Sequence, residues 1–477
     1  MKPAMARLPV AAVLAAAALS GCASLEPAYR RPPEPAPSAW PTGPAYGPAA
    51  VGAPPTAWRD VFQDARLRAI IDLALSQNRD LRVAIAQIEA SRAQYRVQRA
   101  AELPTVSAQA TGTIDRSFAG VPSGPGGSAY ANGHVYSVSA GVTSYELDLF
   151  GRVRSLTRAA LEQYLATEAG RRSTQISLIA EVADDDLALA ADMSQLAISN
   201  QTLASASASL DLAQRKLQGG IASRLDVANA ATVVDQAKAD IGRYTTLVAQ
   251  DRNALNLVVG APVPEDLLPT PGADPGASLA AVPEGLASDG LLRRPDVAQA
   301  EHQLEAAHAD IGAARAAFFP KITLTGSGGT TTTSLASLFA PGSGVWSFGP
   351  SISLPIFDGG ANTANLAYAR AEKRIAVAQY EKAVQSAFRE VADALADRGT
   401  INARLTAQQG LVDHANESVT LAQALYERGA GGYLDVLTAR RTLYVAQQNQ
   451  IATRLARSTN LVTLYKVLGG ALADRAI

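Results

Sequence analysis

The stretch LAQRKLQGGIASRLDV, from Leu212 to Val227, is followed later in the chain by LAQALYERGAGGYLDV, from Leu421 to Val436. The offset is about 209 residues, and the tetrapeptide EVAD recurs with the same offset at 181–184 and 390–393. Self-similarity at a fixed offset is the signature of a chain built from copies of one structural unit. The sequence therefore predicts two copies of a unit of about 200 residues, placed side by side.

Composition shifts around the two copies predict five segments. Each copy has the same order of elements: a helix, a β-hairpin, a very long helix and a return helix. We expect a lipoprotein-type signal peptide at 1–21, a lipidated N-terminus and proline-rich tether at 22–56, a first repeat at 57–260 with its hairpin at 104–149, a linker at 261–288, and a second repeat at 289–477 with its hairpin at 320–357. The tether cannot build a core, so it should run extended between lipid and folded body.

The N-terminus reads MKPAMARLPVAAVLAAAALSGC and contains the only cysteine of the sequence, Cys22. A basic start and about a dozen apolar residues are too short to cross a bilayer and are typical of a secretion signal. The letters LSGC resemble the bacterial lipobox, whose cysteine is lipidated and becomes the mature N-terminus. The alternative is an ordinary signal peptide with a cysteine there by chance. Ala23, by resemblance to sorted lipoproteins, favours the outer membrane.

Composition argues against several classes of function. The formal net charge is −1 and no basic run resembles a phosphate-binding surface, so nucleic acid is not expected as a partner. Glu305-x-x-His308 lacks the second Glu-x-x-His that a di-iron site would need. We therefore expect no metal and no cofactor beyond the lipid on Cys22. An enzyme is the weakest interpretation, because no paired acid and base, metal cluster or nucleotide loop is visible.

After the first helix of each copy the hydrophobic period changes to two. Apolar residues alternate with small polar ones in four stretches of about ten residues, and Trp346, Phe348 and Leu354 share one face of the last. On its own, this alternation better fits a half-buried strand of a soluble sheet. The lipoprotein context favours transmembrane strands. We expect outer loops at Gly120–Gly133 and Ser334–Ser343, where the paired strands are joined.

The number of strands has a consequence for assembly. Lipid tolerates no open sheet edge, and the smallest membrane barrels have about eight strands, so four strands cannot close alone. Several chains must pool their strands, and oligomerisation is required.

The tracts from about 152 to 217 and from about 363 to 426 predict two very long helices. At 1.5 Å per residue each would be roughly 100 Å long, on the scale of a periplasm. A sustained seven-residue repeat of apolar residues predicts coiled-coil pairing. The repeat comprises Val182, Leu189, Leu196, Leu203, Leu210 and Leu217 in copy one, and Leu405, Val412, Val419 and Tyr426 in copy two.

The repeated stretch itself predicts the turns at the ends of these long helices. The turn residues are Gly219 and Gly220 in copy one, and Gly429, Gly431 and Gly432 in copy two. Two roles remain open for Asp226 and Asp435, which follow the turns. They could be helix N-caps, each stabilising by about 1 kcal/mol. They could also form a ring of carboxylates at an opening, whose field would favour cations.

Three stretches, SYELDLFGR, RRPDVAQAEHQLEAAHADIGAARAAFFPKITLTGS and FGPSISLPIFDGG, resemble signature stretches of the TolC-like outer membrane factors. The likeness is to the NodT/OprM-type lipoprotein subunits of tripartite efflux systems and covers essentially the whole mature chain. It implies an α+β membrane protein in which three internally duplicated protomers pool four strands each. They form a 12-stranded β-barrel that continues into a long α-helical coiled-coil periplasmic tunnel.

The resemblance also implies a function, which is a passive exit duct in the outer membrane. The duct would dock through a periplasmic adaptor to an inner-membrane pump, expected to be of the RND type. In that family the positions of Asp226, Asp435 and Tyr426 belong to the periplasmic aperture and its gating contacts, and the glycine turns should dock the adaptor. Two positions depart from the pattern: Gly431 replaces a latching arginine, and Thr438 replaces a second acid. Closure at rest is therefore in doubt.

Two other functions remain open. The chain could be the exit duct of a type I system that secretes proteins or peptides, which only its partners would distinguish. More remotely, it could be a structural coiled-coil lipoprotein or adhesin, although hairpins inside both copies argue against a simple stalk. No methionine-rich or histidine-rich stretch indicates a metal-ion cargo.

Overall fold

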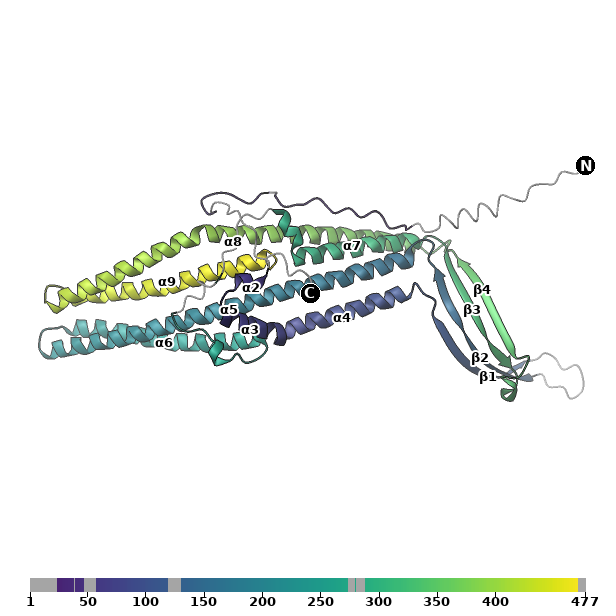
Figure 1. The fold of residues 1–477 in the computed structure, drawn as a ribbon, viewed down its shortest axis with the longest axis horizontal. Coiled ribbons are helices and arrows are strands. Elements are labelled where there is room, and N and C mark those ends of the chain that lie inside the picture. The colour runs from purple at the N-terminus through teal and green to yellow at the C-terminus, as the bar shows by residue number, and fades with distance from the viewer. Residues whose placement is uncertain are drawn as a thin grey trace, which may run out of the picture. The chain divides into compact units, whose positions relative to one another are not determined.

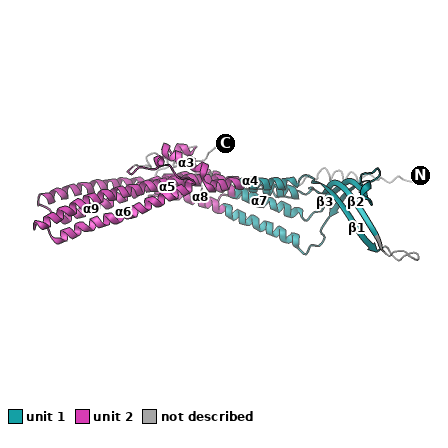
Figure 2. Ribbon diagram, turned by 90° about the horizontal axis from the view of Figure 1, so that it is seen from below, with its two compact units in different colours: residues 1–32, 88–167, 300–380 teal, residues 33–87, 168–299, 381–477 magenta. Residues whose placement is uncertain are grey.

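The computed structural model describes residues 24–37, 39–46, 57–118, 130–272, 279 and 288–470. The chain forms two compact units, each assembled from segments that are far apart in the sequence (Figure 2). Unit 1 comprises residues 1–32, 88–167 and 300–380, and unit 2 comprises residues 33–87, 168–299 and 381–477. Each unit therefore takes residues from both copies of the repeat.

Unit 1 contains one antiparallel sheet of four strands (Figure 1). In spatial order these are β1 (Val106–Phe118), β2 (Tyr130–Leu147), β3 (Lys321–Thr332) and β4 (Gly344–Ser353). This confirms the two predicted hairpins, and pairing of β2 with β3 joins the first copy to the second. β2 has 18 residues rather than about ten, because it continues past a register shift between Val142 and Tyr145.

Of the two expected outer loops, the structure describes the second but not most of the first. The loop predicted at Gly120–Gly133 lies outside the described residues up to 129, and its remainder belongs to β2. The loop predicted at Ser334–Ser343 does join β3 to β4, and it contains the short 3-10 helix η4 (Leu335–Ser337). Two further 3-10 helices are η1 (Glu265–Leu267) and η3 (Ser288–Arg293).

Long helices follow each hairpin, as the heptads predicted. α5 (Arg152–Gln218) and α8 (Ala361–Glu427) have 67 residues each. Their return helices are α6 (Arg224–Val259) and α9 (Tyr433–Val467), and shorter helices α4 (Arg79–Ala100) and α7 (Pro295–Ala316) precede the hairpins. In Figure 1, α6 lies along α5 and α9 along α8. Across the described ranges, no helix is both long and apolar enough to cross a membrane.

The main core of unit 2 lies where two short helices, α2 (Trp58–Val61) and α3 (Ala65–Gln77), meet the longer ones. They pack on the middle of α5 and on the last turns of α6 and α9. The largest fully buried side chains there are Phe62, Leu67, Ile70, Ile71, Ile179, Leu187, Leu189, Leu255 and Tyr465, and the ring of Tyr465 is edge-on to that of Phe62. Because α3 is buried in this core, it needs one apolar face, and the sequence provides it.

The apolar periodicity predicts one helical stretch from about Ala65 to Ala101, and the structure divides this stretch into α3 and α4. The helix ends at Gln77 and restarts at Arg79, because Asn78 is extended, with φ −58° and ψ 137°. Its side-chain oxygen accepts a hydrogen bond from Leu81 N at 2.7 Å, which caps α4. Its amide also donates to the Val258 carbonyl at 2.7 Å, so the break is fixed by α6.

The coiled-coil seam changes in character along α5. Val182 and Leu189 are fully buried, whereas Leu196, Leu203, Leu210 and Leu217 are only half-buried. Toward the end of α5 the fully buried positions are small residues, Ser199, Ala206 and Ala213. Small side chains allow helices to approach closely, so this part of the seam depends on close backbone packing rather than on large leucines.

Candidate functional site

The first turn ends α5 with a left-handed glycine. Gly220 has φ +72°, a conformation that side chains other than glycine rarely adopt. Ile221 N donates to the Lys216 carbonyl at 2.8 Å and Gly220 N to the Leu217 carbonyl at 3.0 Å, which satisfies carbonyls that the helix end leaves open. Ser223 then caps α6. The predicted turn at Gly219 and Gly220 is therefore present.

The second turn repeats this geometry with different residues. Gly429 also has φ +72°, and Ala430 N donates to the Leu425 carbonyl at 2.9 Å. A Cβ on Gly431 would lie 3.0 Å from the Leu425 Cβ, so the chain passes close to α8 there. Gly432 is the N-cap of α9 and has no side chain to accept a hydrogen bond.

Asp226 and Asp435 are not N-caps, so that expectation is corrected. Each lies three residues further on, and its carboxylate reaches back to the N-cap. Asp226 Oδ2 accepts from Ser223 N at 2.9 Å and from Ser223 Oγ at 2.8 Å. Asp435 Oδ2 accepts only from Gly432 N, at 3.3 Å. Asp435 is exposed and Asp226 half-buried, so Asp435 offers the more open carboxylate.

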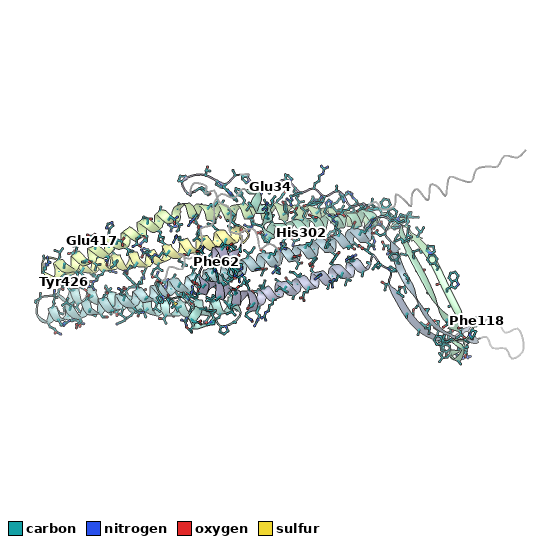
Figure 3. All side chains as sticks on the ribbon, viewed as in Figure 1. Glu34, Phe62, Phe118, His302, Glu417 and Tyr426 are labelled. Atoms are coloured by element: carbon teal, nitrogen blue, oxygen red, sulfur yellow. The ribbon has the colours of Figure 1, made fainter. Side chains whose placement is uncertain are left out.

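Tyr426 lies at a contact between the two turns, and it is labelled at the end of the helices in Figure 3. Its ring is 5.4 Å from the ring of Tyr433, and the Lys216 ammonium lies 3.6 Å from its centroid. Tyr433 is buried with Ala213 and Ala230 of the first copy, and this burial raises its pKa. Sequence analysis missed Tyr433, which corresponds to Arg224 in the first copy.

A second connection between the copies comes from Arg440 of α9. Its guanidinium donates to the Ser205 carbonyl of α5 at 3.0 Å, to Ser209 Oγ, and to Gln423 Oε1 of α8 at 3.1 Å. One turn further along, Tyr444 contacts Ser199 Oγ at 2.8 Å and donates to Asp240 at 2.9 Å. Burial raises the pKa of Tyr444 to about 12.

Arg440 and Tyr444 therefore tie the second helical pair to the first. Neither residue was predicted from the sequence. The repeat does offer one signal, which is that the two copies carry different residues at these positions. At the same offset the first copy has Ala231 and Asp235, so these links belong to the second copy only.

The sheet of unit 1 has one apolar and one polar face. Its register aligns Val106, Val142, Gly326 and Phe348 in one row across all four strands. The next row is Ser107, Gly141, Ser327 and Ser347, in which the two hydroxyls of β3 and β4 are 2.9 Å apart. On the apolar face Phe348 is 66% and Trp346 83% exposed, so none of the described residues covers these two side chains.

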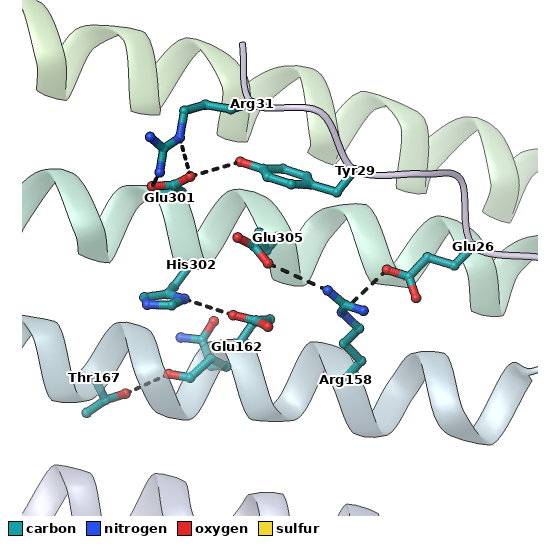
Figure 4. A network of polar contacts seen from close by, with 10 residues as sticks. Glu26, Tyr29, Arg31, Arg158, Glu162, Thr167, Glu301, His302 and Glu305 are labelled. Atoms are coloured by element: carbon teal, nitrogen blue, oxygen red, sulfur yellow. Dashed lines mark hydrogen bonds and ion pairs between the residues drawn. The ribbon is translucent and has the colours of Figure 1, made fainter. Parts of the chain in front are cut away.

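The described part of the predicted tether, residues 24–37 and 39–46, contains no helix or strand, and its first residues dock on α7 (Figure 4). Arg31 forms a bidentate pair with Glu301 of α7, at 2.6 and 2.7 Å. His308 bonds to the Pro27 carbonyl at 2.8 Å, so this histidine is a core residue. A Cβ on Gly151 would lie 3.1 Å from the Ser24 Cα. Cys22 itself lies outside the described residues.

Unit 2 also carries buried carboxylates on α5. Asp186 is fully buried and forms a bidentate pair with Arg66, at 2.6 and 2.7 Å. Burial, with the charge of Asp185, raises the pKa of Asp184 to about 7, and burial beside Glu181 raises that of Asp185 to about 6. Within the described part of the chain, no group of three or more His, Cys, Asp or Glu side chains could hold a metal ion.

Comparison with known families decides what this architecture is. A model of the outer membrane efflux protein family matches residues 70–261 and 286–470. The chain belongs to this family. It is an outer membrane efflux channel with a periplasmic extension and not an enzyme, and its fold is TolC-like, with four antiparallel strands and long helices.

Individual relatives match over nearly the whole length. The toluene efflux pump outer membrane protein TtgC of Pseudomonas putida is 46% identical over 455 residues, or 95% of this chain and 93% of that protein. The antibiotic efflux pump outer membrane protein ArpC of Pseudomonas putida has the same identity and coverage. The open-state outer membrane channel MtrE of Neisseria gonorrhoeae superposes with a TM-score of 0.84 at 37% identity, over 94% of this chain and 99% of that one.

Proposed function

We propose that three copies of this chain close one 12-stranded barrel and serve as the exit duct of a tripartite efflux pump. The observation that carries this proposal is the sheet: β1 pairs only with β2, and β4 only with β3, among the described strands. Such edges cannot face lipid unpaired, and an apolar outer face with a polar inner one suits a closed wall around a wet lumen.

The duct passively conducts drugs or other small toxic compounds. Two relatives are named for toluene and antibiotic efflux, which supports this class. An inner-membrane pump of the RND type supplies the energy for transport. A periplasmic adaptor connects this pump to the duct. The glycine turns, Gly219–Gly220 and Gly429–Gly432, dock the adaptor.

The aperture is formed by Asp226, Asp435 and Tyr426. In a trimer, the two copies contribute six carboxylates, whose field favours cations. The Tyr426 ring packs on Tyr433 and on the ammonium group of Lys216 from the other turn. These contacts would have to break if the two turns moved apart, which supports a role for Tyr426 in gating.

The lipid anchor is on Cys22. Ser24 follows two residues later and packs on Gly151, in the connection from β2 to α5. Fatty-acid labelling of wild type and Cys22→Ser tests the anchor: label retained by the variant would contradict it.

The function is tested in a strain that lacks its own outer membrane efflux channels. Expression of this chain with a cognate adaptor and pump should restore growth in toluene and antibiotics, and native mass measurement in detergent should give three chains. A monomer that still forms pores would contradict the closed wall. Restored secretion of a peptide without restored resistance would instead identify a type I system.

A further inference from the structure

The β3–β4 hairpin is unusual in charge. No Asp, Glu, Lys, Arg or His occurs between Lys321 and Asp358, which covers both strands and their connection. The first hairpin, by contrast, carries Asp115, Arg116 and His134 near the end of its strands. A loop that only faces water gains nothing from such a complete absence of charge.

The connection folds toward the apolar face of the sheet. Thr332 lies in register two residues beyond Thr330 and four beyond Gly328, which pairs with Trp346, so its side chain is on the apolar side. Its Oγ1 is 2.8 Å from Ser337 Oγ in η4. This bond holds η4 on the side of the sheet that carries Trp346 and Phe348.

Further hydrogen bonds make the connection a defined structure. Ser343 Oγ donates to the Leu338 carbonyl at 3.0 Å, and Thr331 N donates to the Ser343 carbonyl at 2.9 Å. Leu338 is buried, at 8% exposure, and anchors the turn. Leu335 and Phe339 nevertheless stand out at 63% and 76% exposure. A well-ordered turn that buries one large apolar residue and exposes two is typical of a contact surface.

We propose that this turn, with Leu335 and Phe339, inserts among the acyl chains of the outer leaflet of the outer membrane. The turn lies at the strand ends opposite those that lead to the long helices α5 and α8, and the helical extension is periplasmic, so this end is the outer one. The occupant is lipid because the turn continues the apolar face of β4. Phe118, labelled at the end of β1 in Figure 3, lies on the same face of the first hairpin.

This inference keeps Ser334–Ser343 as an outer loop but places its two exposed apolar side chains in lipid rather than in water. It rests on the proposed placement of the apolar sheet face in lipid. The experiment therefore needs one probe that tests the sheet face and others that test the turn.

Spin labels on single cysteines separate the possibilities in the full-length lipidated protein, reconstituted in phosphatidylethanolamine–phosphatidylglycerol vesicles. Leu335→Cys and Phe339→Cys probe the turn. Thr331→Cys is the matched control, because Thr331 pairs with Ser137 in a row of the polar face at the outer end of β3. Phe348→Cys reports the apolar sheet face. Unmodified protein gives the background, since its single cysteine, Cys22, carries the lipid.

We expect the labels at 335, 339 and 348 to collide more often with oxygen than with a water-soluble nickel complex, and the label at 331 to show the reverse. If the labels at 335 and 339 follow the control at 331 while the label at 348 reports lipid, the turn is aqueous and the inference is wrong. Low collision rates with both reagents would place the turn against a neighbouring copy and would also overturn it. Nickel access at 348 would contradict the proposed function instead.

Discussion

The long helices of the two copies have the same length but end in different ways. α5 and α8 both have 67 residues, and their turns begin with glycines that share a φ of +72°. The first copy then starts its return helix with Ser223, whereas the second starts with Gly432. Only the second copy carries Tyr433, Arg440 and the links that these residues make to the first. The duplicated frame is kept, and the sequences diverge where one copy has to hold the other.

In the middle of the long helices it is the first copy that carries the additional polar contacts. Copy one has Asp184, Asp185 and Asp186 after its EVA motif, and copy two has Asp393, Ala394 and Leu395. The buried pair of Asp186 with Arg66 fixes the α3 region to α5. The first copy therefore supplies the polar anchor of the core, and the second supplies the connections near the turns.

The largest expected effect concerns the joint between the copies in the sheet. A Cβ on Gly329 would lie 2.1 Å from the Val138 carbonyl oxygen, so β2 and β3 would have to separate. Gly329→Ala should cost about 3 kcal/mol or more and reduce the amount of folded channel in the outer membrane. Gly328→Ala is the control, because a Cβ there meets no atom within 4 Å. Equal yields of the two variants would mean that the copies are not joined as described.

The next effect concerns the link that only copy two makes. Arg440→Ala removes three hydrogen bonds from a charged donor, and we expect a loss of about 2 kcal/mol, seen as a lower melting temperature of the helical circular-dichroism signal. Arg441→Ala changes the adjacent arginine, which takes no part in these three bonds. If both variants melt alike, Arg440 does not hold the copies together.

The two helix starts can be exchanged. Ser223→Ala should lower stability by about 1 kcal/mol, because Asp226 loses the hydroxyl and α6 loses its cap. Gly432→Ser should raise stability by a few tenths of a kcal/mol, since φ −81° and ψ 152° suit serine and glycine is only slightly weaker than serine as an N-cap. The melting temperatures of the two variants should move in opposite directions. Movement in the same direction would show that the helix starts differ for another reason.

The remaining expected effect is on the pH dependence of stability. The pKa of Asp184 is raised from 3.8 to about 7, mainly by burial and then by Asp185, with Lys466 opposing the shift. The native state then binds more protons than the unfolded chain, so this stabilisation is complete below the unfolded pKa and is lost as pH rises through about 7. Between about pH 5 and pH 8 the melting temperature should fall further in wild type than in Asp184→Asn. Parallel curves would contradict this.

Local periodicity was enough to predict the long helices, the four strands and the glycine turns, because these depend on neighbouring residues. It did not predict the break at Asn78, which Val258 of another helix fixes. It also missed Tyr433, Arg440 and the docking of Arg31 on Glu301, which depend on segments more than 200 residues apart. Asp226 and Asp435 were found from the repeat, but their capping geometry required coordinates.

The central claim is that the turns of the two copies form the aperture, with the carboxylate of the second copy more open than that of the first. Single-channel recording of the purified channel in a planar bilayer tests it most directly. Asp435→Ala should raise resting conductance or lower the preference for cations, and Asp226→Ala should do so more weakly, because Ser223 already engages its carboxylate. If both variants match wild type in conductance and selectivity, the two aspartates only stabilise helix starts, and the claim is wrong.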